Sequence, residues 1–134
     1  MSFWFREAHR YFEEPQDYSG TTSTGAAVGT WSPTIAIYEY YRDLYQKRCT
    51  VDLQLFGNPS NATTYLTFTL PFVSRNDALQ SFPVGLIRNN GAAEALGTVY
   101  MLANSSTARI YRSTYTSFTA GAEAGISARF TYRI

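Results

Sequence analysis

The sequence predicts an all-β protein, an antiparallel β-sandwich of jelly-roll type preceded by a short N-terminal helix and an extended arm. Three observations lead to this prediction. Apolar and polar residues alternate over several segments, which is the period of a half-buried strand. Aromatic residues make up 16% of the 134-residue chain and charged residues also only 16%, against about 25% charged residues in an average domain. No helices alternate with the strands, which excludes a nucleotide-binding α/β fold.

The predicted helix covers residues 2–14. Its apolar residues fall on one stripe at helical spacing, namely Trp4, Ala8, Tyr11 and Phe12. Pro15 ends the segment, because the residue before a proline avoids helical geometry. A helix this short is marginal in water alone, so its aromatic side must dock, either on its own domain or as an arm on a neighbouring subunit or a larger particle. The residues expected at such an anchoring interface are Phe3, Trp4, Tyr11 and Phe12.

Residues 16–30 are predicted to form a linker or an extended arm. Small and polar residues dominate this segment without periodicity. Gly20 and Gly25 have the spacing of a phosphate-binding loop, but alanines occupy the positions where such a loop needs its Lys and its Ser or Thr. No nucleotide or other cofactor is therefore expected. The chain divides into an N-terminal anchoring part, 1–30, and a sandwich domain, 31–134.

Beyond the linker, the pattern is that of strands almost throughout. Three segments alternate clearly, at 48–56, 64–72 and 126–134. The side chains that these segments turn towards the core are Cys49, Val51, Leu53 and Leu55, then Leu66, Phe68, Leu70 and Phe72, then Ile126, Ala128, Phe130, Tyr132 and Ile134. Shorter strands are predicted, with turn residues between them, at 34–40, 83–88, 97–103 and 107–112. Seven or eight short strands, spaced about ten to sixteen residues apart, predict the antiparallel sandwich.

Composition excludes several classes of function. A net charge of +1 argues against a nucleic-acid binder that uses a broad basic surface. No apolar run approaches the roughly 18 residues that cross a bilayer, so no membrane insertion is expected, and the first residues lack the features of a secretory signal. A single Cys excludes an intrachain disulfide, and no cluster of Cys and His predicts a metal site.

No arrangement of residues predicts an enzyme. His9, the only histidine, lies in the predicted helix, where a base is not held rigidly. Cys49 faces the predicted core, where a thiol has a raised pKa and is inert. A glycosidase needs two facing carboxyl groups, but no spacing singles out a pair among Glu39, Asp43, Asp52, Asp77, Glu94 and Glu123.

An aromatic stretch contains Tyr38, Tyr40 and Tyr41, with charged residues between and after them. Two interpretations stay open. Aromatic rings flanked by charges can stack on sugars, and Tyr and Arg are also common anchors of protein–protein contacts. We favour the subunit contact. For glycan binding, the loops 57–61 and 89–91 are further candidates.

Four short motifs stand out between residues 29 and 134, namely Gly29-Thr30-Trp31-Ser32-Pro33-Thr34, Cys49-Thr50-Val51-Asp52-Leu53, Leu70-Pro71-Phe72 and Phe130-Thr131-Tyr132. Together they resemble a β-sandwich module of bacteriophage virion proteins, a group that includes tail fibres, head fibres and capsid-decorating proteins. In such a module Trp31 would cap the end of the core, and Pro33 would lie at an edge where no backbone donor is needed. The chain departs from the module after Tyr45, where a Gly is usual and Gln46 stands here.

The resemblance implies a homotrimer in the virion, with the sandwich as a knob and the N-terminal segment as an anchor on the major capsid protein or another virion protein. It implies no catalytic residue. Because the chain is short and begins at Met1, we expect a capsid-decorating, cement or head-fibre protein rather than the tip of a long fibre. The alternative is a tail-fibre-type module that binds a host receptor or a host-surface glycan.

Overall fold

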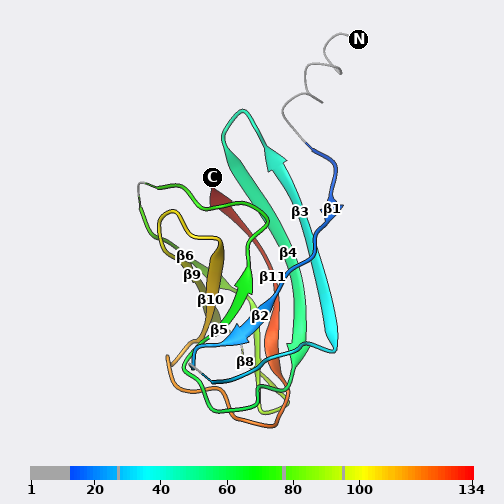
Figure 1. Cartoon of the computed structure of the whole chain (residues 1–134), viewed down its shortest axis with the longest axis vertical. Helices are drawn as coiled ribbons and strands as arrows, with labels where there is room; N and C mark the ends of the chain where they lie inside the picture. The colour runs from blue at the N-terminus through cyan, green and yellow to red at the C-terminus, as the bar shows by residue number, and fades with distance from the viewer. Residues whose placement is uncertain (1–12, 27, 77, 95) are drawn as a thin grey trace.

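The computed structural model describes residues 13–134 except residues 27, 77 and 95, and these form two facing antiparallel sheets (Figure 1). The six-stranded sheet contains, in spatial order, β1 (Gln16–Asp17), β3 (Ile35–Asp43), β4 (Arg48–Gly57), β11 (Ala124–Arg133), β7 (Leu86–Asn89) and β8 (Ala92–Glu94). The five-stranded sheet contains β2 (Thr22–Thr24), β5 (Leu66–Thr69), β10 (Thr107–Arg112), β9 (Gly97–Met101) and β6 (Gln80–Val84). The predicted antiparallel β-sandwich is confirmed.

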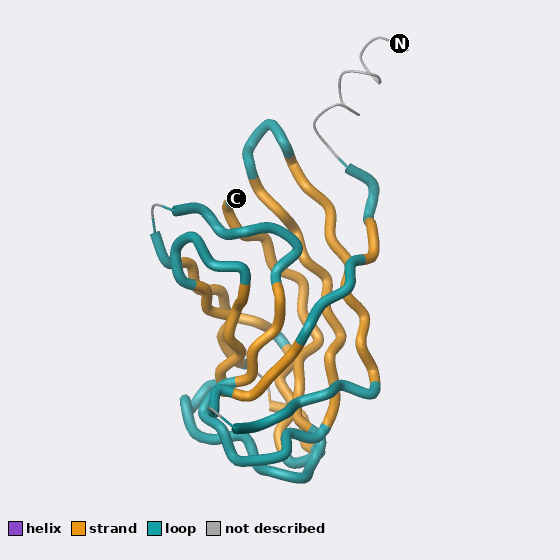
Figure 2. The backbone as a smooth tube through the Cα atoms, viewed as in Figure 1, coloured by secondary structure: helices purple, strands orange, loops and turns teal. Residues whose placement is uncertain are grey.

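The helix predicted over residues 2–14 lies outside the described residues, apart from its last two. Glu13 and Glu14 belong to no helix, so a helix does not reach Pro15 as expected. The described residues contain only strands and loops (Figure 2). The proposed anchoring residues also lie outside the described part of the chain, namely Phe3, Trp4, Tyr11 and Phe12.

Alternation along β4 and β11 places their apolar side chains in the core, as predicted. The inward residues of β4 are all fully buried, namely Cys49, Val51, Leu53 and Leu55. The ladder sets Ala128 of β11 opposite Leu53, and Tyr132 opposite Cys49. Burial raises the pKa of the Cys49 thiol to about 11, which confirms the expectation of a buried thiol with a raised pKa.

The single strand predicted over residues 83–88 is wrong, because the chain changes sheet in the middle of it. β6 ends at Val84 in the five-stranded sheet, and β7 begins at Leu86 in the six-stranded sheet. Gly85 lies between them and gives the backbone the freedom to turn from one layer to the other. Pro83 is on β6, an edge strand, where the missing N–H leaves no ladder bond unmade.

Residues 16–30, predicted to be a linker or an extended arm, run along the edges of both sheets. β1 pairs with β3, and β2 pairs with β5, so the segment crosses from one sheet to the other (Figure 1). Between these strands, the ring of Tyr18 packs on that of Tyr38 with centroids 5.1 Å apart. The Tyr18 hydroxyl donates to the Thr69 carbonyl at 3.0 Å. Gly20 allows this close passage, since a Cβ there would lie 2.3 Å from the Tyr38 ring.

Trp31 is buried in the core, as its place in the opening motif implies. It is only 1% exposed, and its Nε1 donates to the Gly57 carbonyl at 3.1 Å. Its backbone also forms an isolated bridge with Pro59. Pro33 lies so close to the end of β4 that a Cβ at Gly57 would be 2.7 Å from its Cα. The opening motif therefore fixes the end of β4 against the core.

Candidate functional site

The outward side chains of the five-stranded sheet form one row across all five strands. The register aligns Ser23 of β2, Thr67 of β5, Arg109 of β10, Tyr100 of β9 and Ser81 of β6. Because side chains alternate along a strand, the residues on either side of each of these point to the opposite face of the sheet, the one turned towards the core. The row therefore belongs to the outer surface.

Four tyrosines gather around this row. Together with Arg109 they form what we call the tyrosine surface, namely Tyr65, Tyr100, Tyr111 and Tyr115. Tyr111 lies at its centre, with its ring centroid 5.5 Å from that of Tyr65, 6.3 Å from that of Tyr100 and 5.3 Å from that of Tyr115. The Tyr115 hydroxyl donates to the Thr98 hydroxyl at 3.3 Å. Rings at these separations attract one another, so the cluster is held in place by its own contacts.

Arg109 holds its guanidinium group among these rings. Its Cζ lies 4.5 Å from the centroid of the Tyr65 ring, and its Nη1 donates to the Tyr111 hydroxyl at 3.4 Å. This hydrogen bond raises the pKa of Arg109 above its ordinary value, so the group is a cation at any physiological pH. The five strands contain no Asp or Glu, and within the described ranges Arg109 makes no ion pair.

A hollow of about 390 Å³ opens beside Tyr111. Its walls are the side chains of Leu79, Ser81, Thr98, Tyr100, Tyr111 and Tyr115. They offer aromatic faces, one aliphatic chain and hydroxyl groups that can donate or accept hydrogen bonds. None is a carboxylate, imidazole or thiol, so the lining is suited to binding and contains no ordinary general base.

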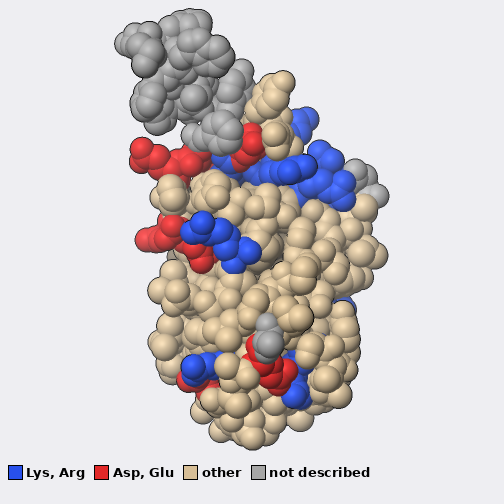
Figure 3. All heavy atoms as spheres, turned by 180° about the vertical axis from the view of Figure 1, so that it is seen from behind, with Lys and Arg blue, Asp and Glu red and all other residues tan. Residues whose placement is uncertain are grey.

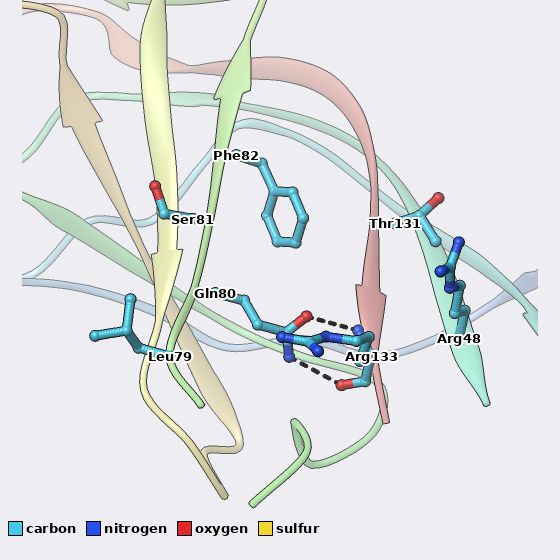
Figure 4. Close-up of a pocket in the computed structure, with 7 residues that line it drawn as sticks. All are labelled: Arg48, Leu79, Gln80, Ser81, Phe82, Thr131 and Arg133. Atoms are coloured by element: carbon cyan, nitrogen blue, oxygen red, sulfur yellow. Dashed lines mark hydrogen bonds between the residues drawn. The ribbon is translucent and has the colours of Figure 1, made fainter. Parts of the chain in front are cut away.

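A second hollow, of about 440 Å³, lies between β6 and the end of β11 (Figure 4). It is lined by Arg48, Leu79, Gln80, Ser81, Phe82, Thr131 and Arg133. The Gln80 side-chain amide donates to the Arg133 carbonyl at 3.0 Å, and its oxygen accepts the Arg133 N–H at 2.7 Å. Gln80 thus bonds the end of β11 much as a neighbouring strand would. Leu79 and Ser81 line both hollows, so the two hollows meet at β6.

Four of the eight acidic side chains in the described residues form ion pairs with arginines. Acidic and basic groups lie beside one another in small groups on the face shown in Figure 3. The pairs are Glu13 with Arg42, Asp52 with Arg129, Glu94 with Arg112 and Glu123 with Arg88. Among the described residues, no three His, Cys, Asp or Glu gather to hold a metal ion. In the same residues, no helix has the length and apolar character needed to cross a membrane.

The three tyrosines predicted as a contact do not form one patch. Tyr38 and Tyr40 stand opposite Leu53 and Val51 in the ladder and pack against the core, with the Tyr40 ring centroid 5.9 Å from that of Tyr18. Alternation turns Tyr41 to the outer face of the same strand. Burial raises the pKa of Tyr38. Of the three, Tyr41 is therefore the one on the outer face of its sheet.

The two predicted glycan-contact loops, 57–61 and 89–91, both contact the segment that precedes β11. Gly121 N donates to the Pro59 carbonyl at 2.8 Å, and Gly91 N donates to the Glu123 carbonyl at 2.9 Å. None of the residues in these loops lines either of the two hollows described above.

No model of a known protein family matches the chain, and no curated protein matches it. Function is therefore inferred from the residues and geometry, together with the motif resemblance given above.

Proposed function

We propose that this chain is a structural protein of a bacteriophage virion, of the capsid-decorating, cement or head-fibre type, that forms a homotrimer and attaches through its N-terminal segment. The proposal includes a jelly-roll arrangement, which is supported by the nested pairing of the strands, β4 with β11, β5 with β10, β6 with β9 and β7 with β8. The partner surface belongs to the major capsid protein or another virion protein. The sandwich motifs supply the resemblance on which this identity rests.

The observation that carries the anchoring role is the fixed point at which the N-terminal segment leaves the sandwich. Glu13 N donates to the Arg42 carbonyl at 3.1 Å, and the Arg42 guanidinium pairs with the Glu13 carboxylate. Arg42 itself lies over the ring of Phe72, with Cζ 4.2 Å from the centroid. Glu13, the first described residue, is therefore fixed to β3 of a folded sheet.

The test is removal of residues 1–12 alone. A deletion of residues 1–30 would also remove β1, β2 and Tyr18, which join the two sheets, so loss of binding would then have two explanations. The shorter deletion should abolish co-sedimentation with virions stripped of the protein. By light scattering, the full chain should have three times its mass of 15.1 kDa, and the truncated chain should have three times its own, smaller mass.

A matched pair of variants tests the aromatic residues themselves. Replacing Phe3 and Trp4 together by Ala should weaken attachment as the deletion does, whereas replacing Ser2 and Glu7 together by Ala should leave it unchanged. Attachment by the truncated chain at the level of the full chain would remove the anchoring role. A monomeric full chain, on and off the particle, would remove the trimer.

We infer that the chain acts by binding rather than by catalysis, which the uncharged lining of the 390 Å³ hollow and the arginine-paired carboxylates support. The second candidate function is that of a module that binds a host-surface glycan. The tyrosine surface is the specific observation in its favour, because ring faces beside hydroxyl groups match the two sides of a sugar. This assigns the glycan site to Tyr100, Tyr111 and Tyr115 in place of the stretch around Tyr40.

A further inference from the structure

We propose that the tyrosine surface binds an acidic polysaccharide, with a sugar ring in the 390 Å³ hollow and the sugar carboxylate at Arg109. This inference rests on the second candidate function, glycan binding, and is independent of attachment to the virion. It adds the chemical class of the ligand and the residue that selects it.

The hollow has the size and lining that a sugar ring requires. Its volume, about 390 Å³, lies within the range of small-molecule sites, about 300–1,000 Å³. Tyr100, Tyr111 and Tyr115 supply ring faces for the C–H side of a sugar, and Thr98 and Ser81 supply hydroxyl groups for its polar edge. Tyr115 is 58% exposed, so its ring can contact a ligand that enters from solvent.

Arg109 does not line this hollow, but it lies beside two of the residues that do. It is directly opposite Tyr100 in the ladder, and it bonds the hydroxyl of Tyr111. Both of these tyrosines line the hollow. A carboxylate attached to a sugar stacked on Tyr100 or Tyr111 would therefore have a guanidinium group beside it.

No carboxylate of the described residues pairs with Arg109, and this sets it apart from the other arginine of the same sheet. Arg112 pairs with Glu94 at 2.8 Å, whereas the contacts of Arg109 in the described part of the chain are with tyrosine rings and a tyrosine hydroxyl group. A half-buried cation without an anionic partner attracts an anion, and a guanidinium group binds a carboxylate with two parallel hydrogen bonds. Charge complementarity thus selects an acidic ligand, and the aromatic hollow selects a sugar over an acidic peptide.

The experiment measures binding of two polymers by titration calorimetry, polygalacturonate and polysialate, each compared with its methyl-esterified form. Esterification removes the charge and keeps the sugar rings. The full chain should bind at least one of the acidic polymers about tenfold more tightly than its ester, a ratio expected for one charged hydrogen-bonded pair. Added salt should reduce this preference, since the contact is ionic.

Three variants separate the contribution of the Arg109 charge to binding from that of the tyrosine rings. Arg109→Gln should remove the preference for the acidic form and leave binding of the ester unchanged. Tyr115→Ala should weaken both forms by a similar factor, because it removes a ring and no charge. Arg129→Gln, which removes an exposed arginine on the other sheet, is the matched control and should change neither.

Each other outcome overturns the inference in a distinct way. Equal binding of an acid and its ester would leave a neutral-glycan site and remove the role of Arg109. Binding of neither polymer nor its ester would remove the acidic-polysaccharide ligand, whatever the result of the attachment test. Equal affinity for poly-glutamate would identify an acidic protein as the partner. A change of oligomeric mass in Tyr115→Ala would identify the surface as a subunit contact.

Discussion

The outer faces of the two sheets carry different chemistry, although the sheets share one core. The strands of the six-stranded sheet contain five acidic residues and five arginines. Those of the five-stranded sheet contain two arginines and no acidic residue, and their outer face is covered by Tyr, Thr and Ser. The six-stranded sheet contains both partners of an ion pair, Asp52 and Arg129, whereas the five-stranded sheet has a cation, Arg109, that pairs with no carboxylate among the described residues.

The row that crosses the middle of the six-stranded sheet illustrates the first case. The register sets Glu39 of β3 beside Asp52 of β4, and Asp52 beside Arg129 of β11. The Arg129 guanidinium donates twice to Asp52 Oδ2, at 3.2 and 2.8 Å. Asp52 thus lies between an acidic residue and an arginine, and it pairs with the arginine of its own sheet. The corresponding row of the five-stranded sheet has Arg109 between Thr67 and Tyr100, which is why we place the ligand there.

The largest expected effect is on the stability of the core, which the two sheets share. Leu53 of the six-stranded sheet and Ile110 of the five-stranded sheet are both fully buried in the core. Replacing either by Ala should lower the free energy of unfolding by about 2–5 kcal/mol, from lost burial and the cavity left behind. Urea unfolding measures both, with Leu102→Ala as a control at a 49% exposed position, where a change within about 0.5 kcal/mol is expected.

Similar losses of unfolding free energy at Leu53 and Ile110 would establish that both sheets contribute to the core and that they differ in their outer faces. If one substitution cost less than about 1 kcal/mol while the other cost several, the core would belong mainly to one sheet. The contrast between the outer faces would then have to be explained by unequal stability.

The second effect separates the tyrosines of the two outer faces. Tyr111 contacts three other rings, whereas Tyr41 makes no ring contact with any described residue and stands opposite Thr50. Tyr111→Ala should cost about 1–2 kcal/mol, because it removes several cross-strand aromatic contacts at once. Tyr41→Ala should cost less than about 1 kcal/mol, as a single half-exposed cross-strand position does. Urea midpoints at unchanged slope measure both.

Equal costs for the two tyrosines would mean that the ring contacts of the tyrosine surface do not hold it together. The surface would then be a set of independent side chains, and its rings would need to be ordered by the ligand. That result would argue against a preformed hollow and would leave the proposed role of Arg109 unchanged.

The sequence predicted the core well and the site poorly, for one physical reason. Burial along a strand follows from alternation within a short segment, so the inward residues around Leu53 and Phe130 could be identified directly. A surface on a sheet depends on which strands are neighbours, and Tyr65, Tyr100 and Tyr111 come from β5 or just before it, β9 and β10. The alternation of apolar and polar residues in each segment already implied that these tyrosines face outward. It did not show that β10 pairs with both β5 and β9.

The same reasoning explains two predictions in which local sequence misled, the tyrosine patch and the linker at residues 16–30. Tyr40 and Tyr41 are adjacent in sequence and suggested one patch, but alternation sends them to opposite faces of β3. Residues 16–30 show no periodicity because β1 and β2 have only two and three residues, too few for an alternating pattern to be visible. Their pairing with β3 and β5 is a tertiary effect that local sequence does not encode.

The smallest expected effect is an acid-induced loosening that should be confined to the six-stranded sheet. The hydrogen bond from the Arg42 guanidinium holds the pKa of the Glu13 carboxyl below its ordinary value. The unfolded chain therefore takes up this proton at a higher pH than the folded chain does. The resulting stability is fully present above the ordinary pKa of about 4.3 and is lost as the pH falls through the lower, folded value. Because the side chains of Arg42 and Glu13 are partly exposed, at 28% and 18%, the loss of stability should stay below about 1 kcal/mol.

Hydrogen exchange at pH 6 and pH 3, corrected for intrinsic rates, measures this loosening residue by residue. The amides of Glu13 and Tyr18, which bond carbonyls of β3, should lose protection in acid. Those of β9 and of β10 up to Ile110 should not, because these strands contain no carboxyl group and only Arg112, at the end of β10, pairs with one. In Glu13→Gln the protection near β1 should be reduced at both pH values and independent of pH. If β9 and β10 loosened equally in acid, the two sheets would respond together, and the absence of acidic residues from the strands of the five-stranded sheet would have no effect on its stability in acid.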